Sequence, residues 1–205
     1  MAEKKEVIML PEGRLINHSL FERDQYDENS APVYNVEIAF DKGVLDDINN
    51  KMLDFAVEKW GAAAEDTVVL PIKDGNAMKA KREAKGKAGD AYEDKDVIRA
   101  STQFNRHGEK GPGGISIYGM DGESEIGIAN QSEIYQGCNV IAAVTFDGYT
   151  ESKTDLPAIT VYLTAVQKTG DGERLVSQAD HSKLFKPVGR KPAAEGGSTR
   201  SHRAG

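Results

Sequence analysis

The sequence predicts a mainly β domain with one principal α-helix, folded as a small, partly closed barrel with long loops. Apolar and polar residues alternate over several stretches, which is typical of strands in a sheet with one buried face. One stretch, residues 44–60, instead repeats apolar residues at spacings of three and four, the pattern of an amphipathic helix. Gly137, Gly148 and Pro157 lie where bulges or bends let a small sheet curl toward closure.

The N-terminal third contains two predicted strands. Residues 7–10 and 14–21 are interpreted as one interrupted strand, and the acidic, turn-rich residues 22–32 as an exposed loop. Residues 34–40 give the clearest half-buried strand, because every second residue is apolar.

The predicted helix, residues 44–60, carries one apolar stripe that we expect to pack across the barrel. The stripe comprises Leu45, Ile48, Met52, Phe55, Ala56 and Trp60. Gly61 follows as the expected C-terminal stop, since glycine is the residue most suited to the position after a helix.

The segment 73–96 is predicted to be a long mobile loop, because it is rich in Lys, Ala and Gly and has no apolar periodicity. Loops of this length in compact domains are commonly functional or disordered. Residues 97–105 follow as a strand and residues 106–114 as a glycine-rich turn. Short strands are expected at 115–117 and 126–128.

Residues 130–175 are expected to close the domain as a turn, a strand, a polar loop and a second strand. The residues expected to face the core are Val140, Ala142, Val144 and Phe146 in the first strand and Ile159, Val161 and Leu163 in the second. Tyr162 is expected to point away from them, because neighbouring strand residues lie on opposite faces.

Composition favours one domain and a tail. The chain has 205 residues, of which 39% are hydrophobic, enough for one core of moderate size. We expect residues 1–182 to form a single domain, and residues 183–205, which have almost nothing to bury, to form a flexible basic tail. No apolar run approaches the roughly 20 residues of a membrane span, so a cytoplasmic location is expected.

No convincing catalytic arrangement is present in the sequence. The 4 histidines are scattered, and no Ser or Cys nucleophile lies in a recognised setting. The single cysteine, Cys138, excludes an internal disulfide, and neither zinc-ligand nor phosphate-loop spacing occurs. The acidic residues at 24–28 and 46–47 lack a recognised calcium-loop spacing. We therefore expect no enzyme activity, no cofactor and no bound metal.

The charge distribution is uneven. The formal net charge of -7 argues against a nucleic-acid partner, because affinity for DNA depends largely on Lys and Arg neutralising phosphates. Residues 73–87 nevertheless contain six basic residues against Asp74 and Glu83, and residues 183–205 six against Glu195. These runs are either phosphate-binding segments or a solvated loop and a solvated tail.

Four short motifs occur in a fixed order across roughly residues 14–175. They are Lys59-Trp60-Gly61; Leu70-Pro71-Ile72-Lys73-Asp74-Gly75, leading through Tyr92 to Val97-Ile98-Arg99-Ala100-Ser101; Ser132-Glu133-x-Tyr135-x-Gly137-Cys138; and Val166-Gln167-Lys168 with Asp171-Gly172-Glu173. In this order they resemble a bacteriophage family of single-stranded DNA-binding proteins. The resemblance implies an OB-fold that coats single-stranded DNA in phage replication, recombination or repair, and the strand count together with the single amphipathic helix predicts five strands for it. Single-stranded DNA is the implied partner; phage or host replication and recombination proteins and further copies of the chain are the others considered.

Binding to single strands requires a cationic groove and aromatic faces for base stacking. The candidate stacking residues are Tyr92, Phe104, Tyr118, Tyr135, Tyr149 and Tyr162. The candidate backbone contacts are Arg14, Lys73, Lys79, Lys81, Arg82, Lys85, Lys87, Arg99 and Arg106. Phe104 and Tyr162 are also explained by packing between strands, and Tyr135 by plugging the end of the barrel.

Two rival functions stay open beside DNA binding. In a phage structural or scaffold-like β-protein the aromatic residues are core and the Lys-rich loop is solvated. A small hydrolase with an unrecognised carboxylate site is the third hypothesis. The basic C-terminal residues also depart from the acidic tail that phage single-stranded DNA-binding proteins often carry, and a basic tail instead favours extra non-specific affinity for phosphates.

Overall fold

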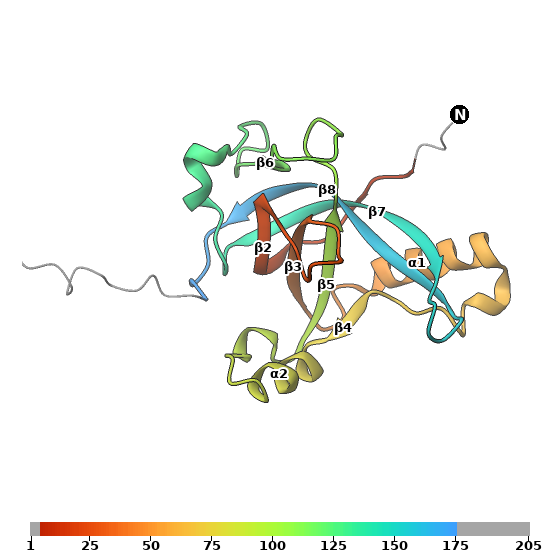
Figure 1. The fold of residues 1–205 in the computed structure, drawn as a ribbon. Helices are drawn as coiled ribbons and strands as arrows, with labels where there is room; N and C mark the ends of the chain where they lie inside the picture. Colours follow the sequence, from red (N-terminus) through yellow and green to blue (C-terminus); the bar gives the residue numbers. More distant parts are fainter. Residues whose placement is uncertain (1–4, 176–205) are drawn as a thin grey trace, which may run out of the picture.

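The structure, a computed structural model, describes residues 5–175 and is mainly β. Its strands are β1 (Ile8–Met9), β2 (Gly13–Asp24), β3 (Val33–Asp41), β4 (Ile72–Asp74), β5 (Lys95–Thr102), β6 (Ser116–Tyr118), β7 (Asn139–Thr150) and β8 (Pro157–Gly170) (Figure 1). The α-helices are α1 (Asp46–Trp60) and α2 (Gly75–Glu83), and short 3-10 helices span Ala62–Ala64 (η1), Asp90–Tyr92 (η2) and Ile128–Glu133 (η3). No helix in this part of the chain is long and apolar enough to cross a membrane.

Five strands pair in a ring, in the order β2, β3, β5, β8, β7 and back to β2. All neighbours in the ring are antiparallel except β5 and β8, which are parallel. The β5–β8 ladder consists of one residue pair, Ser101 with Tyr162, whereas β7 and β8 pair along almost their whole length. The shortest ladder of the ring therefore lies between β5 and β8.

The β7–β8 hairpin confirms the predicted alternation. The seven residues expected to face the core are all buried, and they join the main hydrophobic cluster inside the ring. Tyr162 points outward from β8 and keeps 41% of its surface exposed. Period-two patterning is reliable here because each strand of the hairpin has one face in the core and the other in solvent.

Helix α1 also follows its prediction, beginning at Asp46 and ending before Gly61, which has a φ of 88°. Its apolar face packs beside β7 and β8, at the right of Figure 1. The Phe55 ring meets the ring of Phe146 edge-on, with centroids 6.3 Å apart. A Cβ atom at Gly148 would collide with the Trp60 indole, so this glycine permits the close approach of the helix to the hairpin.

The prediction of a long mobile loop at residues 73–96 is wrong, because this segment forms β4, α2 and η2 before β5 begins. The Asp74 carboxylate caps α2 by accepting a hydrogen bond of 2.8 Å from the Ala77 backbone N–H. Met78 and Tyr92 pack against a second small cluster on the outer side of the sheet. This cluster includes one residue each from β2, β3 and β5, namely Ile16, Ala39 and Val97.

Three smaller boundaries differ from expectation. Residues 7–10 and 14–21 do not form one strand, because β1 pairs with β7 whereas β2 pairs mainly with β3. Strand β5 ends at Thr102, and residues 126–128 lead into η3 instead of forming a strand. The boundary at residue 182 and the basic tail 183–205 lie outside the described residues.

Candidate nucleic-acid interface

A cleft of about 750 Å³ lies between the turn that follows β5, strand β6 and the outward face of the β7–β8 hairpin. Three aromatic residues and three cationic residues line it. They are Phe104, Tyr118 and Tyr162, and Lys5, Arg106 and Lys110. The cleft thus brings together segments from both ends and the middle of the described chain.

Phe104 and Tyr162 expose their rings for different reasons. Tyr162 lies on the solvent side of β8, between the buried residues Val161 and Leu163. Phe104 lies just beyond the end of β5 and keeps 47% of its surface exposed. Packing does not enclose either ring, so both offer apolar surface to a ligand in the cleft.

The turn that carries Phe104, Arg106 and Lys110 is held in shape by two other side chains. The Asn105 amide oxygen accepts hydrogen bonds from the backbone N–H groups of residues 107 and 109, and its amide nitrogen donates to the carbonyl of Pro112. The buried Tyr34 hydroxyl donates to the Gly111 carbonyl at 2.8 Å and accepts from the Gly114 N–H at 3.1 Å. These bonds preorganise the cleft side of the turn.

Two lysines lie over aromatic rings of the cleft. The Lys5 amine is 5.3 Å from the centroid of the Tyr162 ring, and the Lys110 amine is 5.6 Å from that of Phe104. Lys5 also forms an ion pair of 2.5 Å with Asp147. This hydrogen bond from Lys5 is the main reason that the pKa of Asp147 is lowered, so the carboxylate stays ionised at neutral pH.

Arg106 forms an ion pair with Glu125 at 3.2 Å, whereas Lys110 has no carboxylate within 4.0 Å among residues 5–175. Ion pairs as exposed as these are weak, so an incoming phosphate can displace their carboxylate partners at small cost. The cleft therefore suits a ligand that combines flat apolar rings with negative charge.

The cleft contains four of the residues predicted from sequence: Phe104, Arg106, Tyr118 and Tyr162. Sequence reasoning missed Lys5 and Lys110. Lys5 belongs to a charged leader and Lys110 to a glycine-rich turn, and neither position carries a periodic signal. The contact of Lys5 with Tyr162 becomes visible only in the folded ring, and that of Lys110 with Phe104 only in the folded turn, where these two residues form a β-bridge.

The other predicted aromatic residues lie outside the cleft. Tyr92 was expected to stack on bases, but it is 2% exposed, and its hydroxyl donates a hydrogen bond to Glu37. Burial is the main reason that its pKa is raised far above that of an exposed tyrosine. Tyr149 is exposed on β7, on the same outward face as Asp147 but beyond the cleft.

The predicted basic residues outside the cleft fall into three places. Arg14, on β2, donates a hydrogen bond of 2.8 Å to the Glu173 carbonyl. Arg99 is exposed on the outer face of β5. The remaining six, Lys73, Lys79, Lys81, Arg82, Lys85 and Lys87, belong to β4, α2 and the turn after it, at the bottom of Figure 1 and away from β6.

A known protein family matches most of this chain. A sequence model of the family described as Enterobacter phage Enc34, ssDNA-binding protein, matches residues 6–195. The chain belongs to this family. No curated protein matches the chain.

Solved structures of phage proteins have a fold similar to that of this Enc34-family chain. The single-stranded DNA-binding protein of bacteriophage Enc34, solved as a C-terminal truncation, superposes with a TM-score of 0.59 at 19% identity, over 82% of this chain and 88% of its own. The same phage protein in complex with ssDNA gives 0.59 at 18% identity, over 83% and 89%. The gp2.5 single-stranded DNA-binding protein of bacteriophage T7 gives 0.58 at 11% identity, over 97% and 100%.

In this Enc34-family chain the Tyr135-x-Gly137-Cys138 motif joins the end of the hairpin to β2. The Gly137 N–H donates to the Leu15 carbonyl at 2.7 Å, and the Leu15 N–H donates to the Cys138 carbonyl at 2.9 Å. The Tyr135 hydroxyl donates to Asp171, and the Arg174 guanidinium lies 3.9 Å from the centroid of its ring. These contacts favour the packing role for Tyr135 over base stacking.

Proposed function

We propose that this Enc34-family protein binds single-stranded DNA with little sequence preference, and that the cleft is its main binding site. The observation that carries the proposal is the pair of exposed rings, Phe104 and Tyr162, each with a lysine amine over it. A base can take the place of either amine on the ring, and the displaced amine can then neutralise a neighbouring phosphate. Stacking and phosphate contacts read no base edges, so binding depends little on sequence.

The arrangement of strands supports an OB-fold as the framework of this site. Counted along the chain, the five ring strands are β2, β3, β5, β7 and β8. The third of them, β5, pairs with the fifth, β8. OB-folds are five-stranded, partly open barrels that bind oligonucleotides on their second and third strands. Those strands correspond here to β3 and β5, and the cleft begins where β5 ends. The single residue pair between β5 and β8 suits a barrel that is partly open at this seam.

The biological role follows from the same proposal. Coating of single strands in phage DNA replication, recombination or repair is consistent with the phage origin of the matched family and structures. We assign DNA binding to a single domain, residues 1–182. This domain needs no cofactor or metal to bind DNA, and it acts in the cytoplasm of the host cell. The predicted aromatic and basic residues that do not line the cleft have structural or accessory roles in this proposal.

We expect the protein to shift oligo(dT) in a gel at concentrations at which a duplex of equal length stays free. Affinity should fall as salt rises, with a slope of log affinity against log salt of about -0.7 per phosphate contact. The measurement is a competition series at several salt concentrations. Equal competition by the duplex would refute the proposal, and a structural or scaffold-like protein predicts no shift with either DNA.

A further inference from the structure

Two of the cations of the basic segment are used inside the fold. The Lys79 amine lies 3.1 Å from the Glu93 carboxylate and 3.9 Å from those of Glu83 and Asp90. Arg82 donates a hydrogen bond of 2.9 Å to the Ala88 carbonyl and lies over the buried ring of Tyr92. These residues hold α2 and η2 together, so a ligand has to compete with several contacts inside the fold to reach them.

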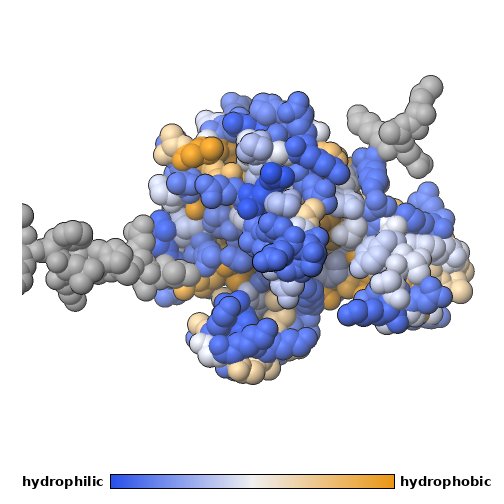
Figure 2. Space-filling view, viewed as in Figure 1, coloured by the Kyte–Doolittle hydropathy of each residue, from blue (hydrophilic) through white to orange (hydrophobic). Residues whose placement is uncertain are grey.

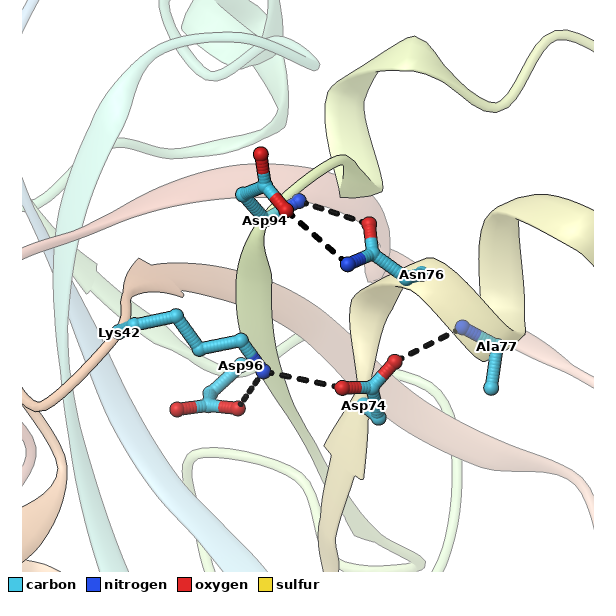
Figure 3. A network of polar contacts seen from close by, with 6 residues as sticks. All are labelled: Lys42, Asp74, Asn76, Ala77, Asp94 and Asp96. Carbon is cyan, nitrogen blue, oxygen red and sulfur yellow. Dashed lines mark hydrogen bonds and ion pairs between the residues drawn. The ribbon is translucent and has the colours of Figure 1, made fainter.

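Acidic side chains of the same segment also have partners, as Figure 3 shows. The Lys42 amine lies 2.6 Å from Asp96 and 3.1 Å from Asp74. The hydrogen bond with Asp96 is the main cause of the raised pKa of Lys42, which therefore stays charged. Asp94 and Asn76 exchange two hydrogen bonds of 2.9 and 3.0 Å, which tie the start of α2 to the start of β5.

The remaining cations of the segment point into solvent. Lys73, Lys81, Lys85 and Lys87 are exposed, and within residues 5–175 none has a carboxylate within 4.0 Å. Hydrophilic residues dominate the surface over α2 in Figure 2. Lys42 pairs with Asp74 and Asp96, and Lys79 is shared by Glu83, Asp90 and Glu93. The four exposed lysines, on a support held in place by these bonds, form a surface that we call the α2 surface.

Strand β5 connects the α2 surface with the cleft. Its 8 residues span roughly 26 Å at about 3.3 Å per residue. Arg99 is exposed midway, without an ion pair in the described chain, and two residues later Ser101 pairs with Tyr162 of the cleft. Alternation places Arg99 and Ser101 on the same outward face. Arg99 therefore provides positive charge between the two sites.

We propose that a strand held in the cleft continues along the outer face of β5, past Arg99, and that the α2 surface binds its phosphates. This inference rests on the proposed function of the cleft. The α2 surface binds only the sugar–phosphate backbone of the strand. It offers no ring for base stacking, because the one aromatic residue of the segment, Tyr92, is buried. It lengthens the binding site and adds salt-dependent affinity without adding stacking.

The test is a series of oligo(dT) ligands of about 4 to about 16 nucleotides, the range of site sizes for OB-folds. Lys81→Ala/Lys85→Ala should flatten the salt slope by about 1.4 for the longest ligand, since each single-strand phosphate contact contributes about 0.7. The shortest ligand, which fills the cleft alone, should bind the variant and the wild type equally. Lys51→Ala, which removes an exposed lysine of α1, is the matched control and should change neither slope.

Three outcomes separate the possibilities. An unchanged slope with the longest ligand, or an equal change with the shortest, would overturn the path along β5 while leaving the cleft intact. A change of similar size per lysine in Lys51→Ala would overturn it too, because the effect would then reflect overall charge. Failure of the wild type to bind any oligo(dT) would instead refute the proposed function.

Discussion

Replacing Phe104 and Tyr162 together with alanine is expected to weaken oligo(dT) binding by at least about thirtyfold. Stacking of one base on an aromatic side chain contributes about 1–3 kcal/mol, so loss of two platforms removes about 2–6 kcal/mol. Both residues keep more than two fifths of their surface exposed, and neither belongs to the hydrophobic clusters. The fold should therefore survive, and fluorescence anisotropy with a labelled oligonucleotide measures the change in Kd.

The matched control is Tyr26→Ala. Tyr26 is 87% exposed, does not line the cleft and lies in the acidic loop between β2 and β3. Its removal should leave Kd nearly unchanged. If the double variant binds as tightly as the wild type, the cleft is not the stacking site. If its melting temperature falls markedly, the rings serve packing instead, the alternative that the sequence left open.

Gly137→Ala is expected to destabilise the protein by about 2–5 kcal/mol. Gly137 has a φ of 110°, a region that side chains with a Cβ rarely adopt. A Cβ there would also overlap the backbone carbonyl of Glu173, which cannot rotate away as a side chain can. For a domain of this size, a melting temperature lower by roughly 5–15 °C should follow in a thermal scan.

Gly127→Ala is the control for this substitution. Gly127 has a φ of -86°, and a Cβ added there meets no atom within 4 Å. Its melting temperature should stay close to that of the wild type. Equal melting temperatures for the two variants would contradict the view that Gly137 is required for the close contact between the ends of the hairpin.

The hairpin and α1 could be predicted from sequence because their burial is periodic. Each has one face in the core, so the apolar residues repeat at the period of the element. Helix α2 lacks this signal, since Met78 is its only large apolar residue and its stability depends on a cap and on contacts with η2. A lysine-rich sequence without an apolar stripe therefore predicts a loop.

The candidate site could be predicted only in part. Tyr162 is predictable because alternation places it outward on β8. Phe104 is predicted as an aromatic residue of a strand over residues 97–105, whereas β5 ends at Thr102 and leaves it in the turn. Lys5 comes from the N-terminal segment, 157 residues before its aromatic partner in the sequence, so only the folded ring reveals that contact. Tyr92 misled the prediction, because an isolated tyrosine in a polar segment gives no indication that a helix will cover it.

The ring of strands has a consequence for how copies of the chain behave when they lie close together. Open sheet edges present unpaired backbone groups that invite pairing between neighbouring molecules and lead to aggregation. Here every ring strand pairs with a neighbour on both sides, over one residue pair at β5–β8 and two at β2–β7, and the strands left at the margins, β1, β4 and β6, span only two or three residues. Closing the sheet on itself leaves less open edge than a flat sheet of the same strands would, which lowers the tendency of neighbouring copies to fuse their sheets.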